Sequence, residues 1–561
     1  MPVTLNQLLG KLDAARRSHG SVKSSELAGT LARLASAKIA DADELVRLHE
    51  ALLFLAAYPP SKPVLAKVER RLKSLRQRVA TLETQDADLS PLDTPEVSGI
   101  AGGSVTSNFS YALARWLARK YPRQLSIDWE WMENEEQWSA ILQRFLPLLA
   151  DDAMVEAHVP LREWLRAATG RQNEFVWLID RFESLDLSDK EKAELYDSLK
   201  LHLTWKFPVR ASRTAMRLPP RNTFFHSEPL IQRRDVVLAA ELSSPSIPVK
   251  KLSRREGEKI LDLARETSAV RYRELHGFTY GDGTRIVKAD LGRGTEAFVI
   301  GVPPETRLPL RAYHAAIIFK NGVPVGYFEG LSLFERMESG FNLYYTFREG
   351  ETAWLYARIL RLMRQLLGVT VFSIEPYQIG HENEEGIESG AFWFYRKLGF
   401  RPVRPEILKL TQAEELKGAN DRRYRTSART LRKLAAGYML FETQSATKKS
   451  GEWDRFEARN IGLALQRRMA QEFRGDAKRL RAHSVDLVRR ALNVKALTSS
   501  SDLPLVLAMI PDLKNWSVAD KELAARVLSA KHGRDEAAFL KQMQKHALLR
   551  AFMIELGSKP G

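Results

Sequence analysis

One segment near the middle of the chain has the composition of a phosphate-binding turn. Phe347-Arg348-Glu349-Gly350-Glu351-Thr352-Ala353 joins a strand-like run to a strongly periodic helical run. The first amides of a helix have no partner inside the helix, and the helix dipole favours an anion beside them. Gly350 permits close backbone approach, and Ala353 is too small to crowd a pyrophosphate. The segment is therefore either a pyrophosphate-binding loop or an ordinary strand-to-helix turn.

A second segment carries a family motif. Residues 388–400 read Glu-Ser-Gly-Ala-Phe-Trp-Phe-Tyr-Arg-Lys-Leu-Gly-Phe, which resembles motif B of the GNAT superfamily, Asn-x-x-Ala-x-x-x-Tyr-x-Lys-x-Gly-Phe. The residues that match it in register are Ala391, Tyr395, Lys397, Gly399 and Phe400. Glu388 stands where the motif has asparagine. The family's pyrophosphate loop, Gln/Arg-x-x-Gly-x-Gly/Ala, is matched by Arg348 and Ala353, with its glycine one position early at Gly350. The resemblance covers about residues 255–405 of the 561 and neither flank.

The resemblance implies an acyl-CoA-dependent N-acyltransferase. Acetyl-CoA or another acyl-CoA would be the co-substrate, and no metal is expected. The residues that would bind its pyrophosphate are Phe347, Arg348, Glu349, Gly350, Thr352 and Ala353. An amine would attack the thioester directly, and Tyr395 would protonate the leaving thiolate. Phenol and thiol have ordinary pKa values of about 10 and 8.5, so this proton transfer needs little adjustment. The alternative is that Tyr395 is a core residue of the aromatic run 392–395.

Direct attack by an amine also needs a group that takes the proton from the ammonium. Three side chains are candidates: Glu329 near the end of a hairpin strand, Glu375 directly after a later strand, and His381. The alternative for each is an ordinary surface side chain, with a chain of waters in place of a protein base. The amine acceptor itself is not identified by the sequence and is a small molecule, a protein or a tRNA-linked group.

The elements around these residues alternate between strands and helices. Asn321-Gly322 separates two apolar runs, a strong hairpin signal because both turn residues need positive φ. The other expected elements are a helix over 254–275, turns up to Pro309, strands at 341–347 and 369–374, a helix that ends at Gly368 and a helix over 389–398. The sequence therefore predicts an α+β fold in which a GNAT-like mixed α/β sandwich lies between mainly α-helical terminal regions.

The domain organisation follows from changes in periodicity along the chain. We expect a helical N-terminal region at 1–82 and a mainly helical region at 83–253, with an irregular boundary at 215–253. The GNAT-like domain would occupy 254–410, and a basic helical region 411–561.

The composition narrows the class of protein. An apolar share of 44% and a charged share of 28% are typical of a globular chain. No apolar run is long enough to span a membrane, and the first residues have no signal-peptide core. Cysteine is absent, which excludes disulfides and thiolate nucleophiles, and a cytoplasmic location is the default expectation.

The net charge of +17 is concentrated at the C-terminal end, where residues 411–561 hold 29 Lys and Arg against 17 Asp and Glu. A cluster at 422–433 would form a stripe along one helix face, able to bind a polyanion. Internal pairing, for example with Glu382–Glu385, is the other interpretation. The alternative function is accordingly a catalytically inactive GNAT-like scaffold whose basic helices bind nucleic acid or an acidic protein.

Overall fold

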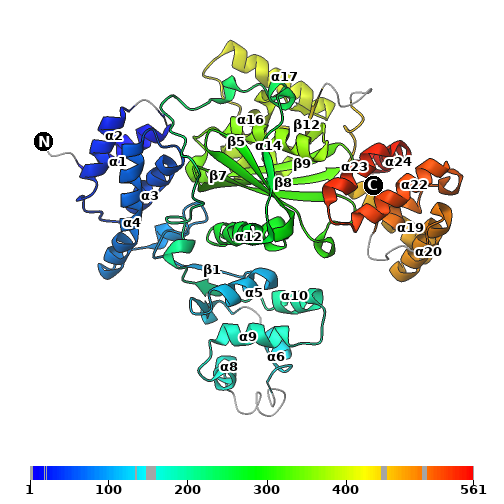
Figure 1. The fold of residues 1–561 in the computed structure, drawn as a ribbon, viewed down its shortest axis with the longest axis horizontal. Coiled ribbons are helices and arrows are strands. Elements are labelled where there is room, and N and C mark those ends of the chain that lie inside the picture. The colour runs from blue at the N-terminus through cyan, green and yellow to red at the C-terminus, as the bar shows by residue number, and fades with distance from the viewer. Residues whose placement is uncertain are drawn as a thin grey trace.

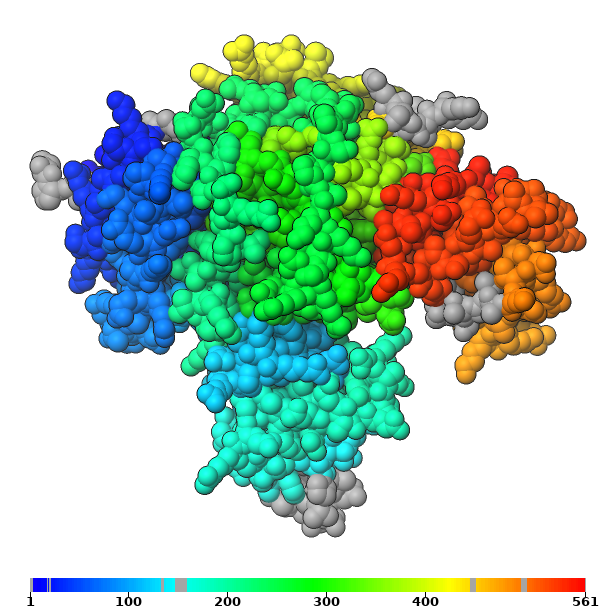
Figure 2. All heavy atoms as spheres, viewed as in Figure 1, coloured from blue at the N-terminus to red at the C-terminus, as the bar shows by residue number. Residues whose placement is uncertain are grey.

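The computed structural model describes residues 4–17, 19, 22–132, 135–146, 159–443, 451–495 and 502–559. Within them the chain is a mixed α+β protein built on one nine-stranded sheet, so the expected α+β class is confirmed. Figure 1 shows this sheet at the centre, with helical groups to the left, below and to the right. The space-filling view in Figure 2 shows the same three groups projecting from a central body.

The large sheet has the order β11-β12-β10-β9-β8-β7-β6-β5-β4. Its strands are β4 (Val249–Lys251), β5 (Ile286–Gly292), β6 (Thr295–Ile300), β7 (Ala312–Lys320), β8 (Val323–Leu333), β9 (Arg336–Leu343), β10 (Val371–Ile374), β11 (Arg401–Pro402) and β12 (Met439–Glu442). All neighbours are antiparallel except β9 and β10, which are parallel. A mixed sheet of this kind needs a crossover helix between its two parallel strands.

The sheet draws strands from beyond the 254–410 segment, because β4 precedes it and β12 follows it. The expectation of turns alone between the helix after Ser253 and Pro309 is wrong, since β5 and β6 form a hairpin there. Gly292 and Gly294 have φ of 85° and 71° and make the hairpin turn that separates the two strands. Beta6 pairs with β7, and β5 pairs with β6 and β4, and local sequence does not reveal this pairing.

The predicted hairpin at Asn321-Gly322 is confirmed. The two residues have φ of 46° and 76°, and Lys320 pairs with Val323 across them. The side-chain Nδ2 of Asn321 also donates to the carbonyl of Ala57, 2.8 Å away, so the turn is anchored to the N-terminal helices. This hairpin forms the centre of the sheet.

Strands β9 and β10 part after a short contact. Arg336–Glu338 of β9 pair with Val371–Ser373 of β10, but β9 continues to Leu343 whereas β10 ends at Ile374. The strand expected at 341–347 was placed too late: it begins at Arg336, and Tyr345–Phe347 form a 3-10 turn. The sheet is therefore open beside the second half of β9.

Helices cover both faces of the sheet. One face is packed by α12 (Arg254–Ala269) and α13 (His276–Thr279), and the other by the crossover helix α14 (Thr352–Leu367) with α16 (Ala391–Lys397). Alpha14 ends at Gly368, whose φ of 73° is the left-handed stop expected from the sequence. The short helix α15 (Glu384–Glu388) and a 3-10 turn at Pro376–Ile379 connect β10 to α16.

The N-terminal region is helical, as predicted, and shares the core of the sheet's α14 face. Its helices are α1 (Leu5–Arg17), α2 (Ser24–Arg33), α3 (Ala42–Ala57) and α4 (Lys62–Thr84). The next segment forms a lobe with a separate core. This lobe contains a three-stranded sheet of β1 (Val105–Ser107), β3 (Leu203–Trp205) and β2 (Leu125–Ile127), with α5 (Tyr111–Lys120), α6 (Glu135–Leu142), α8 (Leu161–Thr169), α9 (Glu174–Glu183) and α10 (Asp189–Ser198). The short helix α11 (Leu238–Ser243) lies against α14.

The C-terminal region is mainly helical and is tied to the central sheet. Its elements are α17 (Pro405–Asn420), α18 (Ala428–Leu434), α19 (Ala458–Phe473), α20 (Ala477–Leu492), α21 (Leu503–Leu507), α22 (Val518–Lys531), α23 (Glu536–Lys545) and α24 (Ala547–Ser558). Arg550 of α24 pairs with Glu335, which lies between β8 and β9, and with Glu452. No helix in the described part of the chain is long and apolar enough to cross a membrane.

The expected helical stripe at 422–433 is wrong, because α17 ends at Asn420 and residues 421–427 are not helical. Arg432 is instead held by both oxygens of Glu384, at 2.9 and 2.8 Å. For this arginine the structure therefore shows internal pairing.

Candidate functional site

A cleft of about 900 Å³ lies where β9 and β10 part. Its walls combine the end of α1, segments 231–233 and 272–275, strands β8 and β9, the start of α14, and α15 with α16. It brings together most of the residues singled out from the sequence: Glu329, Arg348, Glu349, Gly350, Thr352, Ala353 and Tyr395. Residues that are far apart in the chain thus share one hollow at the opening of the sheet.

Tyr395 lies on the wall of the cleft near the crossover helix. Its ring packs against Tyr356 and Phe400, with ring centres 5.6 and 5.7 Å away. No described residue forms a hydrogen bond with its hydroxyl, and burial raises the pKa of that hydroxyl above its ordinary value. The phenol therefore keeps its proton at neutral pH, as a proton donor must, but it is a weaker acid than an ordinary tyrosine.

The predicted pyrophosphate loop leaves part of the first turn of α14 open. The Gly350 amide donates to the carbonyl of Phe347 at 2.9 Å, and the Glu351 amide to the hydroxyl of Tyr58 at 3.4 Å. No acceptor within the described residues meets the amides of Thr352 and Ala353. Phe347 is buried and does not line the cleft. An anion in the cleft is therefore best met by the amides at the start of the helix.

The N-terminal helices hold this loop in place. A Cβ at Gly350 would lie 2.5 Å from the hydroxyl oxygen of Tyr58, so a larger residue would displace the loop or the tyrosine. Arg16 of α1 pairs with Glu349 at 2.8 Å. The buried Glu50 of α3 accepts from the hydroxyl of Thr346. The position of this glycine thus has a structural reason, its contact with Tyr58, the residue that follows α3.

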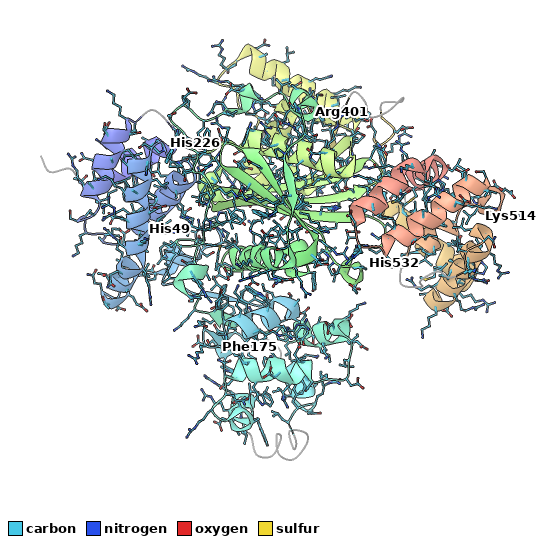
Figure 3. The ribbon with its side chains drawn as sticks, in the orientation of Figure 1. His49, Phe175, His226, Arg401, Lys514 and His532 are labelled. Carbon is cyan, nitrogen blue, oxygen red and sulfur yellow. The ribbon has the colours of Figure 1, made fainter. Side chains whose placement is uncertain are left out.

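A buried ion cluster lies behind the start of α14. Lys320 and Glu351 are both fully buried, with Nζ and Oε2 2.8 Å apart, and Arg293 donates from Nε to Glu351 at 2.9 Å. Burial lowers the pKa of Lys320 to about 8. Figure 3 labels the neighbouring His226, which lies between the N-terminal helices and the sheet. Two cations against one carboxylate leave a net positive charge beside the helix start, which favours a bound anion.

Glu329 lies in the cleft on the face of the sheet that α12 and α13 cover. It accepts a hydrogen bond from the hydroxyl of Tyr313, and that hydroxyl accepts from the Gly277 amide at 3.0 Å. Burial raises the pKa of Glu329 above its ordinary value. A fixed carboxylate with a raised pKa is a stronger base than an exposed one and suits proton abstraction.

The other two candidate bases lie outside the cleft. Glu375 precedes the 3-10 turn whose Tyr377 and Gln378 line the hollow, but its own side chain does not. Burial and then the charge of Glu338 raise its pKa. His381 is exposed and also outside the lining. Of the three, only Glu329 is placed to meet a substrate.

Several cleft residues were not found from the sequence. Arg17 and Arg233 line the cleft and form no ion pair among the described residues. Arg348, which the sequence did place in the loop, is paired with Glu385. Arg233 donates to the carbonyl of Lys397 at 3.1 Å. Arg17 and Arg233 come from segments that carry no motif, so only the fold could reveal their position.

Comparisons of the chain with family models, with curated proteins and with solved structures found no match. Among the described residues, no group of three or more His, Asp and Glu side chains is placed to hold a metal ion. The site is therefore interpreted from its own geometry.

Proposed function

We propose that this chain is an N-acyltransferase that moves an acyl group from acyl-CoA to an amine. One observation carries the proposal: a proton donor, a carboxylate base and an open helix start line a single cleft where the sheet parts. Tyr395, Glu329 and the amides of Thr352 and Ala353 supply these three functions. Acetyl-CoA is the donor we propose first, with no metal in the reaction.

In this reaction the thioester carbonyl carbon lies between the tyrosine and the carboxylate. The ammonium group of the acceptor gives one proton to Glu329, and the neutral amine then attacks that carbon, which forms the C–N bond. The C–S bond breaks, and the leaving thiolate takes the proton of the Tyr395 hydroxyl. The second proton lost by the attacking nitrogen restores the hydroxyl of Tyr395, and Glu329 releases its proton to solvent. The pyrophosphate lies at the first turn of α14, where the dipole and the positive charge of the Lys320 cluster favour it. The products are an amide and free CoA.

The proposal is tested by measuring acetyl-CoA binding and then turnover. Calorimetry with acetyl-CoA is expected to give saturable binding, and a panel of amines to release free CoA. Tyr395→Phe is expected to lower turnover by about 10²–10⁴-fold, the usual contribution of a general acid, with acetyl-CoA affinity nearly unchanged. Absence of acetyl-CoA binding to the folded chain would refute the proposal. Binding without turnover of any amine would favour the inactive scaffold.

A further inference from the structure

Arg273 stands out among the cleft residues because it is held in place but forms no ion pair with any described residue. Its Nη1 donates to the hydroxyl of Tyr327 at 3.0 Å. With the Asn342 amide turned so that its oxygen faces the guanidinium, the same Nη1 donates to it at 3.2 Å. Two side chains on neighbouring strands thus fix one edge of the guanidinium.

The rest of the guanidinium has no anionic partner. No carboxylate of the described residues forms an ion pair with Arg273, and its Nη2 and Nε form no hydrogen bond within those residues. Glu274, the next residue, is engaged by the amide and hydroxyl of Ser110 at 2.8 and 2.6 Å. Glu385, whose charge raises the pKa of Arg273, forms its ion pair with Arg348 instead. A guanidinium presents a planar fork of donors that matches a carboxylate. Arg273 therefore offers an open anion site on the cleft wall.

The site lies on the same side of the sheet as the proposed base. Tyr327 pairs with Asn342 and Glu329 with Gly340 in the antiparallel register of β8 and β9. Tyr327 and Glu329 are two residues apart on one strand, so their side chains project from the same face, roughly 7 Å apart along the strand. An acceptor with its amine beside Glu329 can therefore extend an anionic group along the same face of the sheet toward Arg273.

From this arrangement we propose that the acyl acceptor is an amino acid, with its amine at Glu329 and its carboxylate on the guanidinium of Arg273. The assignment rests on the proposed acyltransferase function and names its substrate class. Arg273 also lines a second cavity of about 350 Å³, which shares Tyr272, Arg273 and Glu274 with the main cleft. The acceptor carboxylate thus binds at the boundary between the two hollows, and the acyl group approaches from the side of Tyr395.

The test compares amino acids with the amines that differ from them only by the carboxylate. Suitable pairs are phenylalanine and 2-phenylethylamine, histidine and histamine, arginine and agmatine, and glutamate and 4-aminobutyrate. In the best pair the amino acid is expected to have a kcat/KM about 10–100-fold higher, the usual effect of a hydrogen bond to a charged group. Arg273→Met is expected to lower kcat/KM for the amino acid to about that of its amine, which removes the preference. Arg273→Lys is expected to restore part of it.

A binding measurement separates this inference from the proposed reaction. Calorimetry with the same amino acids, on the full chain saturated with free CoA, reports the carboxylate contact without any turnover. Arg166→Met is a matched control, because Arg166 pairs with Glu174 in the lobe at 3.0 Å, away from both cavities. The inference would be overturned if an amine bound as tightly as its amino acid. It would also be overturned if Arg273→Met lowered the affinity for the amine as much as the affinity for the amino acid. Absence of acetyl-CoA binding alone would refute the reaction, while amino-acid binding lost in Arg273→Met would still support the site.

Discussion

Glu329, the base in the proposed reaction, is held by a hydrogen bond from the hydroxyl of Tyr313. It must be deprotonated to act as a base, and burial raises its pKa. We expect kcat/KM for acyl transfer to fall as the pH drops through this raised pKa. Glu329→Gln is expected to lower the rate by about 10²–10⁴-fold and to abolish that acidic limb. A pH–rate profile of both proteins measures the effect.

Glu375→Gln is the matched control for this experiment. Its carboxyl also has a raised pKa but lies outside the cleft lining, so the acidic limb should persist. The same limb in Glu329→Gln as in the unmodified protein would exclude Glu329 as the base.

At the residue scale, the cleft contains residues that the sequence singled out because they belong to a local pattern. Tyr395 stands in a spaced motif and Glu329 in a hairpin, and both line the cleft. Arg273 could not be found, because its role depends on Tyr327 and Asn342, which the antiparallel register brings opposite each other. Such a contact arises from strand pairing and leaves no signal in local composition.

At the scale of the element, the start of α14 offers a test that separates binding from folding. Thr352 is the first residue of the helix, where a negative side chain is favourable to the helix dipole. Thr352→Glu gains this favourable interaction but loses the hydrogen bond from the Thr352 hydroxyl to the carbonyl of Arg348, 3.0 Å away, so thermal stability should change little. The same charge would repel a pyrophosphate, so acetyl-CoA affinity should fall at least about tenfold, as measured by calorimetry.

Thr352→Gln, which has nearly the same shape without the charge, is expected to bind acetyl-CoA much more tightly than Thr352→Glu. Equal affinities in these two variants would place the pyrophosphate elsewhere. Gly350 is unsuitable for this purpose, because any side chain there meets Tyr58 and disturbs the fold.

The sequence predicted helices and strands best where a segment has a long apolar periodicity or a characteristic turn. The helix that ends at Gly368 and the hairpin at Asn321-Gly322 were both found, since each has a strong local signal. Beta12 was missed, because four residues between helical segments become a strand only through pairing with β10 and β11.

At the scale of the whole molecule, removing the basic C-terminal region would also remove a strand of the central sheet, β12. A chain that ends at 411 would lack β12, whereas a chain that ends at 443 would retain it. We expect the shorter chain to lose cooperative thermal unfolding, because β10 and β11 would both lose their shared partner. The longer chain should keep the transition at a lower Tm, since it loses contacts such as that of Arg336 with the carbonyl of Phe456. Circular dichroism on heating measures both, and an unchanged Tm for the shorter chain would contradict this account.

The late position of β12 also has a consequence for the synthesis of the chain. Strands β4 to β10 leave the ribosome first, but the outer edge of β10 has no partner until Glu442 has been added. At about 5–20 residues per second, the interval from Ile374 to Glu442 lasts roughly 3–14 s. An apolar strand edge exposed for that time can pair with another nascent chain. Efficient folding in the cell therefore depends on how well that edge is shielded until translation supplies its own covering strand.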